Sequence, residues 1–367
     1  MRPVTARAPG RVNLIGEHTD HTDGLALPMA LDVGVAFHGE GGGDRIRVTS
    51  ADAALEVDLP ADGSSSPTAG WGRYVAAVAA ELHACGRPPV GLTGEFSSTL
   101  PQGIGLSSSA ALEVAVAVAL LRAADHALPA VEVVRACRRA EHAAVGVPSG
   151  VLDQAASVLS RSGAALLLDC ADLAHEDVAL PEGVEVLIID SGVTRQLEGS
   201  GYATRTRELA AALPVLDGRR PADVPPDELP GLLDALDEVP ARRLRHVVTE
   251  NARVRATVRA FAADDIDAVA TLFEASHDSL RDDFEVTVPQ TDRLVELLRE
   301  HGALASRMTG GGFGGAVIGL VRAEEASDVA DATLAAYRRA WPDLAARTVL
   351  TRPGAGAAEH AADVLTS

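Results

Sequence analysis

Lysine is absent from this 367-residue sequence, because all 32 of its basic residues are arginine. A Walker A phosphate loop needs a lysine on the nucleotide phosphates, and a protein kinase needs one on its third strand. Pyridoxal enzymes and Schiff-base aldolases need a lysine amine. All three mechanisms are therefore excluded. A genomic preference for arginine and alanine accounts for the absence equally well, yet the exclusion holds either way.

Positive charge is also scarce. The 32 basic residues stand against 52 acidic ones, which gives a net charge of −20. Such a field repels a polyanion at long range, so nucleic acid is excluded as a partner. An anionic nucleotide can still bind, because local backbone N–H groups, arginines and a metal ion outweigh a distant, salt-screened surface charge.

Cysteine is rare, and no long uncharged run occurs. Cys85, Cys137 and Cys170 are widely spaced in apolar surroundings, which favours reduced core residues over disulfides or zinc ligands. The N-terminal sequence MRPVTARAPG lacks the apolar stretch of a secretory signal, and no window of about 20 residues is free of charge. We therefore expect a cytoplasmic protein without a membrane partner.

The length and the hydrophobic content of 47% exceed what one compact core usually holds, so two domains sharing a ligand cleft are expected. Residues 1–60 predict strands and loops, and 214–240 predict short helices joined by loops. Further helices and strands are intermixed without a steady period, which predicts an α+β fold with a domain change near residue 180. The predicted helices are 107–127, 131–145, 242–262, 264–280 and 289–301, and the predicted strands are 164–169, 184–190 and 316–323.

The sharpest local signal is PQGIGLSSSA at 101–110, where a glycine turn leads serines into the start of an apolar helix. Unpaired N–H groups and the helix dipole attract anions to such a start, and serine hydroxyls bind phosphate or Mg²⁺. The alternative is an ordinary helix cap with spare serines.

Two further segments carry unusual composition. MTGGGFGG at 308–315 places five glycines in six positions, which predicts positive φ angles or a closely packed backbone, either at the first glycine turn and its phosphates or in a structural turn. GRVNLIGEHTD at 10–20 ends an apolar run in a dense set of hydrogen-bonding side chains, as a polyhydroxylated ligand requires. Its continuation makes HTDHTD at 18–23, for which a zinc site is the weaker interpretation.

Together these segments resemble the galactokinase branch of the GHMP kinases. Further blocks match in the same order, and the resemblance spans residues 8 to about 320: WGRYV at 71–75, AEH at 140–142, GVLDQ at 150–154, RRLRHVV at 242–248 and SHDSLRDD at 276–283. The resemblance implies two domains. A ribosomal protein S5 domain 2-like N-terminal domain would cover 1–180, and a ferredoxin-like C-terminal domain would cover 181–350. A tail at 351–367 would pack back on the N-terminal domain.

The resemblance also implies an activity, the direct in-line transfer of a phosphoryl group from ATP to the C1 hydroxyl of D-galactose with Mg²⁺. In similar enzymes the aspartate that matches Asp153 is the proposed base, and the arginine that matches Arg11 lies beside it. A neighbouring guanidinium makes a carboxylate a weaker base, so positioning of the hydroxyl is expected to matter more than proton abstraction.

The remaining roles are carried over from the same motifs. The sugar is expected to contact Glu17, His18, Asp20, Gly150 and Tyr202. ATP is expected to contact Gly103, Gly105, Ser107, Ser108, Ser109, Trp71, Tyr74 and Arg195, and Mg²⁺ is expected at Ser109 and Glu141. If the family resemblance is set aside, Asp153 is interpreted as a buried structural carboxylate and Glu141 as a solvated helix residue. Trp71 and Tyr74 are then interpreted as ordinary residues of the hydrophobic core.

One departure concerns the sugar. The family usually has Tyr-Asn where this chain has His21-Thr22, which leaves the packing behind the sugar pocket and the epimer preference open. The alternatives are therefore a GHMP kinase for another sugar, such as N-acetylgalactosamine, and a non-catalytic sugar and ATP sensor. A metal hydrolase built on HTDHTD is a third. We expect a monomer whose partners are galactose and ATP.

Overall fold

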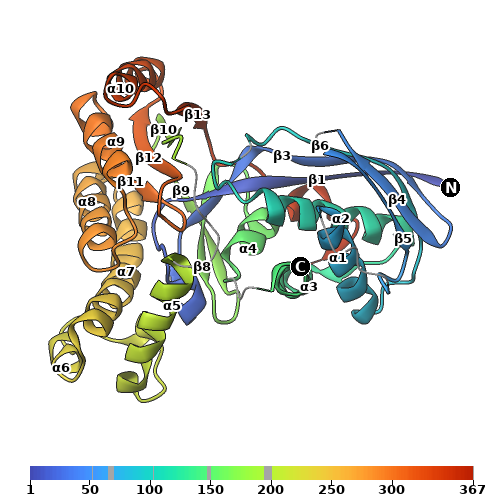
Figure 1. The fold of residues 1–367 in the computed structure, drawn as a ribbon, viewed down its shortest axis with the longest axis horizontal. Coiled ribbons are helices and arrows are strands. Elements are labelled where there is room, and N and C mark those ends of the chain that lie inside the picture. The colour runs from blue at the N-terminus through green and yellow to red at the C-terminus, as the bar shows by residue number, and fades with distance from the viewer. Residues whose placement is uncertain (52, 65–69, 102, 147–149, 194–200, 367) are drawn as a thin grey trace.

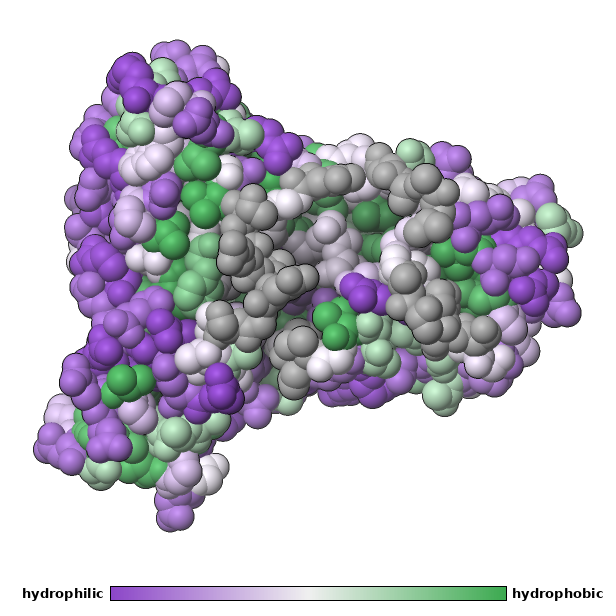
Figure 2. Space-filling view, in the orientation of Figure 1, coloured by the Kyte–Doolittle hydropathy of each residue, from purple (hydrophilic) through white to green (hydrophobic). Residues whose placement is uncertain are grey.

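The computed structural model describes residues 1–51, 53–64, 70–101, 103–146, 150–193 and 201–366. Figure 1 shows an elongated N-terminal part built on long strands, joined to a C-terminal part whose helices stand side by side at the other end. Hydrophilic side chains cover much of the outer surface of both parts in the same orientation (Figure 2). None of the helices in the described ranges is long and apolar enough to cross a membrane.

The N-terminal part contains a five-stranded sheet in the order β1-β3-β6-β4-β5. All neighbouring strands are antiparallel except β4 and β6, which are parallel. The strands are β1 (Arg2–Asn13), β3 (Pro28–Gly41), β4 (Arg45–Ser50), β5 (Ala53–Pro60) and β6 (Leu92–Ser98). Two small sheets join β2 (Leu25–Ala26) with β8 (Ala164–Asp169) and β9 (His175–Ala179), and β7 (Leu128–Pro129) with β14 (Leu365–Thr366).

Three helices pack on this sheet: α1 (Gly72–Ala84), α2 (Ser108–Ala124) and α4 (Leu152–Leu159). Helix α3 (Ala130–Val145) packs on these three helices. Helix α2 lies on β1 and β3 and is buried around most of its circumference, as its alanine- and leucine-rich sequence predicts. Its buried face includes one carboxylate, Glu113, which is fully covered.

The C-terminal part has a four-stranded antiparallel sheet in the order β11-β12-β10-β13. Its strands are β10 (Val184–Asp190), β11 (Ala305–Thr309), β12 (Ala316–Arg322) and β13 (Arg347–Thr351). Helices separate β10 from β11 and β12 from β13, which is the ferredoxin-like arrangement. These helices are α5 (Gly201–Ala212), η2 (Leu213–Leu216), η3 (Pro221–Asp223), α6 (Leu229–Leu233), α7 (Glu238–Ala262), α8 (Ile266–Asp282), α9 (Pro289–Glu300) and α10 (Ala326–Ala340).

The elements agree with the sequence predictions at several points. Strands β8 and β10 have the predicted bounds, and helices α3, α7, α8 and α9 differ from theirs by a few residues at one or both ends. The predicted domain change near residue 180 falls between β9 and β10, which belong to different sheets. Cys137 and Cys170 are free and buried as predicted, whereas the free Cys85 is only partly covered.

The last residues of the described chain return to the N-terminal part. The Gly354 amide donates to the Ala30 carbonyl and the Gly356 amide to the Ser160 carbonyl. Helix α11 (Ala357–His360) packs on α4 and β1, and β14 pairs with β7 in parallel. Figure 1 accordingly shows the C-terminus beside α3, far from the C-terminal helices.

Candidate active site

Two cavities lie next to each other in this structure. The first has a volume of about 250 Å³ and draws its walls from both parts of the chain. The second, of about 390 Å³, belongs to the N-terminal part. Ser109 lines the second cavity and Glu141 the first, and the Ser109 hydroxyl donates to Glu141 Oε1 at 3.2 Å, so the two cavities adjoin.

Asp153 lies in the wall of the first cavity at the start of α4. Arg11, from the end of β1, holds its Oδ1 with Nε at 2.8 Å and Nη2 at 2.7 Å. The Ser107 hydroxyl donates to Oδ2 at 2.5 Å. Arg11 also donates from Nη1 to the Gly105 carbonyl at 2.8 Å, so one guanidinium fixes the carboxylate against the first glycine turn. The pairing of Arg11 with Asp153 that the motifs predicted is therefore present.

Ser107 departs from an ordinary helix cap. It occupies the N-cap position of α2 with a φ of 55°, in the left-handed region, and no side-chain cap is formed among the described residues. Its hydroxyl is used on Asp153 instead. The start of α2 therefore keeps backbone N–H groups that an anion can satisfy.

A chain of polar contacts runs from this edge into the core. The Gln154 amide nitrogen donates to Glu141 Oε2 and to Glu113 Oε2, each at 3.0 Å. Burial, and secondly the charge of Glu141, raises the pKa of Glu113 to about 9, so Glu113 is protonated at neutral pH. Gln154 thus orients Glu141 toward Ser109. This orienting role of Gln154 was not predicted from the sequence. Its signal was Glu113, the single acid inside the apolar helix α2.

The polar end of the first cavity is formed by the turn after β1 and by Gly150 and Tyr202. A Cβ on Gly150 would lie 1.6 Å from Asp20 Oδ2, so only glycine allows this approach. The ring centroids of His18 and Tyr202 lie 5.5 Å apart. Burial, followed by His21 and His246, lowers the pKa of His18 well below its usual value, and burial raises the pKa of Tyr202. Both rings are therefore neutral.

Asp20 differs from these rings because it carries charge. Burial pushes the pKa of Asp20 upward, but the hydrogen bond and the charge of His21 outweigh this and leave the pKa below its usual value. His21 Nδ1 lies 3.4 Å from Asp20 Oδ1. The cavity therefore presents a carboxylate acceptor beside a neutral imidazole and a neutral phenol.

Glu17 lines the same cavity, although its side chain is engaged by the protein. Its Oε2 lies 2.5 Å from Arg307 Nη2, and its Oε1 accepts from the Thr309 hydroxyl at 3.2 Å and the Gly310 amide at 3.1 Å. Glu17 is 3% exposed. It thus ties the first motif to the second glycine segment, and the predicted contact with a sugar hydroxyl stays a prediction.

The second glycine segment packs closely, as its composition predicts. Its glycines at 310, 312, 314 and 315 have positive φ angles. A Cβ on Gly312 would lie 2.4 Å from the Val286 carbonyl, and one on Gly314 2.9 Å from the Val193 carbonyl. In the described residues the segment thus lies against the turn after β1, Val193 and Val286, and it faces the first cavity with Gly310 and Gly311.

The second cavity combines aromatic rings with the start of α2. Trp71 and Tyr74 line it together with Phe96, whose ring centroid lies 6.1 Å from that of Trp71. Gly103, Ser108 and Ser109 complete the side that faces α2. The aromatic pair and the serine segment, predicted to bind one ligand, are therefore brought together. Arg195, predicted to contact the same ligand, lies outside the described residues.

The comparisons with known proteins agree with this geometry. Residues 1–39 match the galactokinase galactose-binding signature, 73–161 match the GHMP kinases N terminal domain, and 257–339 match GHMP kinases C terminal. The crystal structure of Lactococcus lactis galactokinase complexed with galactose is 30% identical, with a TM-score of 0.91 over 96% of this chain and 94% of that chain. The chain belongs to the galactokinase family of GHMP kinases.

Other GHMP kinases share the fold of this galactokinase-family chain. The mevalonate kinase of Methanococcus jannaschii is 18% identical, with a TM-score of 0.66 over 96% of this chain and 98% of that one. The homoserine kinase of Cytophaga hutchinsonii is 17% identical, with a TM-score of 0.61 over 97% and 96%. The predicted two-domain α+β fold of the family is thereby confirmed.

Residues of HTDHTD at 18–23 line or support the first cavity, whereas the metal hydrolase hypothesis made them metal ligands. Two of its residues, His18 and Asp20, line the first cavity, and His21 packs behind them with its ring centroid 6.1 Å from that of Tyr202. Within the described ranges, no group of three or more His, Cys, Asp or Glu side chains is arranged to hold a metal ion.

Proposed function

We propose that this chain is a galactokinase, which transfers the terminal phosphoryl group of ATP to the C1 hydroxyl of D-galactose and releases galactose 1-phosphate and ADP. The observation that carries the proposal is the place of Asp153. It is held by Arg11 and Ser107 in the wall of the first cavity, beside the start of α2 where the second cavity begins. A carboxylate there can meet a sugar hydroxyl on one side and a phosphoryl donor on the other.

The sugar binds in the first cavity, which we call the sugar side of the site. Asp20, His18 and Tyr202 present a charged acceptor and two neutral groups in fixed positions, and Glu17 and Gly150 complete the pocket. A buried site built to hydrogen-bond each hydroxyl rejects analogues that lack one, because its polar groups are then left unpaired. The galactose-binding signature over residues 1–39 and the galactose complex of the Lactococcus lactis enzyme support this assignment.

The nucleotide binds in the second cavity, which we call the nucleotide side. Trp71 and Tyr74 offer ring faces to the adenine, and the glycine turn at Gly103 and Gly105 leads the phosphates to the helix start. There the α2 dipole and N–H groups favour negative charge. The serines at 107–109 and Arg195 are assigned to the phosphates.

The donors at the junction of the two sides fit Mg²⁺. The Ser109 hydroxyl and the Glu141 carboxylate are hard oxygen donors 3.2 Å apart, and Mg²⁺ takes one or two such protein oxygens together with phosphate oxygens and water. A bound Mg²⁺ supplies positive charge to the phosphate oxygens. Gln154 keeps the Glu141 carboxylate facing Ser109.

Asp153 acts first by orienting the C1 hydroxyl. Its two oxygens already accept from Arg11 and Ser107, and the guanidinium charge balances its own. Phosphoryl transfer has a loose transition state that needs little nucleophilic force, so a weak but well-placed base is sufficient. The carboxylate accepts the hydroxyl proton as the new O–P bond forms and the bond between the γ-phosphorus and the bridging oxygen of ADP breaks.

The decisive experiment is an ADP-release assay over a panel of sugars with wild type, Asp153→Asn and the control Asp278→Asn, whose side chain on α8 is half-exposed. We expect D-galactose to give the highest kcat/KM. Asp153→Asn should lower kcat at least about a thousandfold with its melting temperature retained. Full turnover of Asp153→Asn would refute the role of the carboxylate. Binding of galactose and ATP without ADP release by the wild type would favour the sensor.

A kinase for another sugar is the second candidate, and one observation favours it. His21 stands where the family usually carries tyrosine, and it packs on Asp20 and Tyr202 at the back of the pocket. N-acetylgalactosamine therefore belongs in the panel. A higher kcat/KM for it than for galactose would replace the first assignment.

The proposed function also bears on the oligomeric state and the cellular compartment of the enzyme. Every residue assigned to the two sides belongs to one chain, so we propose a monomeric enzyme, and size-exclusion chromatography with light scattering tests this. The free cysteines and the use of ATP suit the cytoplasm.

A further inference from the structure

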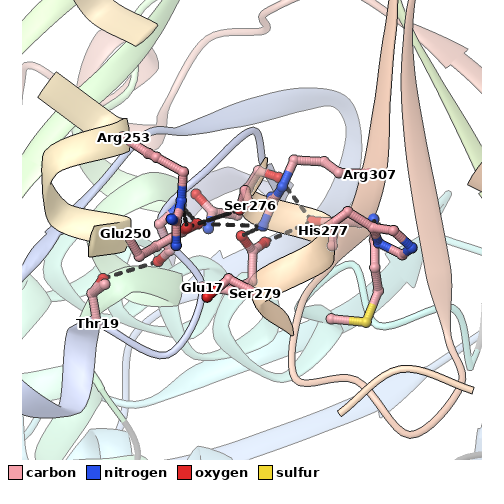
Figure 3. Close-up of polar contacts among 12 residues, drawn as sticks. Glu17, Thr19, Glu250, Arg253, Ser276, His277, Ser279 and Arg307 are labelled. Carbon is pink, nitrogen blue, oxygen red and sulfur yellow. Dashed lines mark hydrogen bonds and ion pairs between the residues drawn. The ribbon is translucent and has the colours of Figure 1, made fainter. Parts of the chain in front are cut away.

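Two of the sequence blocks have no part in the site described so far. RRLRHVV at 242–248 lies on α7, and SHDSLRDD at 276–283 lies mainly on α8. Both helices belong to the C-terminal part, and α7 packs against α8. Their buried polar side chains, with Glu250 among them, gather behind the turn that carries Glu17, His18 and Asp20, as Figure 3 shows for part of this group.

Side chains of α7 bind the backbone of this turn directly. The Gly16 amide donates to Glu250 Oε1 at 3.0 Å, and the Leu25 amide donates to Asn251 Oδ1 at 2.7 Å. His246 Nε2 lies 3.1 Å from the Glu17 carbonyl and is placed to donate to it. Three backbone groups at the two ends of the sugar-binding segment are thus held by one helix of the other part.

Glu250 is the centre of this support. It is fully buried, and its carboxylate also accepts from the Ser276 hydroxyl at 2.7 and 2.8 Å and from Arg253 Nε at 2.7 Å. Burial raises the pKa of Glu250, but Arg253, Arg307 and His246 outweigh it, so the net pKa lies below the usual value. The side chain is therefore ionised in the folded protein.

Arg307 completes the group from β11. It is fully buried, donates from Nη1 to the Leu14 carbonyl at 2.9 Å, and places Nη2 2.5 Å from Glu17 Oε2 and 3.5 Å from Glu250 Oε1. Two carboxylates, of Glu17 and Glu250, thus meet the buried guanidinium of Arg307 and the partly covered one of Arg253 in one cluster (Figure 3). Loss of one charge leaves its partners buried and unpaired, which is costly.

The supported turn needs such a scaffold because its backbone is unusual. Gly16 has a φ of 102° and His18 a φ of 61°, and a left-handed conformation is strained for a residue with a side chain. Strained backbone persists where surrounding contacts determine it. Buried ion pairs, by contrast, seldom add net stability over apolar packing, so stability alone does not explain a charged cluster at this place.

We propose that Glu250 is a positioning residue for the sugar side, which acts through the Gly16 amide and Arg307 to fix the turn that carries Glu17, His18 and Asp20. The proposal rests on the proposed galactokinase function. It assigns Ser276 and Arg307 as the partners that orient the Glu250 carboxylate. None of the three needs to touch the sugar.

The test separates the KM for galactose from the KM for ATP and from kcat. Glu250→Gln keeps the size of the side chain but removes its charge. It should raise the galactose KM about tenfold while the ATP KM stays within about twofold. The milder Ser276→Ala should raise the galactose KM about threefold. The control is Thr257→Val, an isosteric change at a buried site of α7 away from the turn, which should leave both KM values unchanged.

Thermal unfolding and calorimetric titration with galactose and a non-hydrolysable ATP analogue accompany the kinetics. Unchanged galactose KM and Kd in folded Glu250→Gln and Ser276→Ala overturn the proposal, as does an equal loss for galactose and ATP. If Glu250→Gln does not fold, Ser276→Ala decides alone. A wild-type protein that phosphorylates no galactose contradicts the proposed function instead, and the galactose Kd of the variants then tests the positioning role separately.

Discussion

The two sides of the cleft are built in different ways. The sugar side assembles Arg11, Glu17, Gly150, Tyr202 and Gly310 from four separate stretches, and a buried charged cluster holds its turn. The nucleotide side takes the residues that line its cavity from between 35 and 112, within the N-terminal part. Its anion-binding feature is the backbone at the start of one helix. Discrimination between hydroxyls thus depends on oriented side chains, whereas attraction of phosphate depends on main-chain groups.

This contrast has a consequence for mutations. A side chain on the sugar side keeps its orientation only while its distant supports remain, so changes far from the ligand should still reach the galactose KM. The nucleotide side has fewer such supports and should respond mainly to residues that touch ATP. The following predictions test that difference.

The largest effect is expected for Gly150→Ala. The new Cβ would lie 1.6 Å from Asp20 Oδ2 and must displace this carboxylate from the sugar pocket. We expect kcat/KM for galactose to fall about a thousandfold, while the Kd of a non-hydrolysable ATP analogue changes less than about threefold. Gly103→Ala tests the other side, because its Cβ meets open space among the described residues while the strain of a φ of 81° falls on the nucleotide turn. Loss of nucleotide affinity in Gly150→Ala would show that the two sides do not respond separately to mutation.

The second prediction concerns pH. Burial, opposed by Glu250, lowers the pKa of His246 from 6.5 to about 4, so the folded state stays neutral at a pH where the unfolded chain takes a proton. The contribution to stability is complete above about pH 6.5 and is lost as the pH falls toward about 4. It amounts to about 1.4 kcal/mol per pH unit, or about 2 to 3 kcal/mol over the window.

His246→Asn should therefore show a shallower decrease in the free energy of unfolding between pH 6.5 and 4.5 than the wild type. Denaturant unfolding at several pH values measures this slope, which is independent of the lower starting stability of the variant. Glu250, Arg253 and Asp283 face His246 and are unchanged in the variant. Identical slopes would show that His246 does not titrate in this way.

A smaller effect is expected for Ser107→Ala, which lies where the two sides meet. The substitution removes the hydrogen bond to Asp153 Oδ2 and keeps the backbone at the helix start. We expect kcat to fall about tenfold with the galactose KM nearly unchanged and the ATP KM raised only slightly, because Ser107 is also assigned to the phosphates. Ser108→Ala is the matched control, since Ser108 lines the nucleotide cavity. Equal kcat losses in the two variants would mean that the Ser107 hydroxyl has no special link to Asp153.

The smallest effect is expected for Tyr74→Leu. Loss of the ring removes one face from the nucleotide cavity and should raise the ATP KM about threefold to tenfold, without a change in the galactose KM. Tyr74→Phe keeps the ring and should behave as the wild type. A larger shift in the galactose KM than in the ATP KM would contradict the assignment of Tyr74 to the nucleotide side.

Local sequence predicts much of this molecule because many elements are determined by short-range patterns. The apolar runs of β8 and β10 and the alanine-rich helix α2 follow from residues that are neighbours in the chain. The paired positions of Arg11 and Asp153, by contrast, came from the family motifs. They lie 142 residues apart, and no spacing rule links them.

The supports of the site could not be predicted in the same way. Glu250 alone is an acid in a polar helix, and its buried state depends on Gly16, 234 residues away, and on Arg307, 57 residues away. Gln154 likewise acquires its role only when α2 and α3 bring Glu113 and Glu141 to it. One signal was present in the sequence, since Arg307 places a charge just before the glycine segment, within the short strand β11.

The return of residues 353–365 to the N-terminal part bears on biosynthesis. The Gly163 amide donates to the Pro353 carbonyl, the Gly356 amide to the Ser160 carbonyl, and the Leu128 amide to the Val364 carbonyl. A nascent chain on the ribosome therefore leaves the surfaces of α4 and β1 that α11 covers exposed until residues 353–365 emerge. The helices of the C-terminal part have been translated by then. The N-terminal part is made first, yet it completes its packing only after those helices have been made.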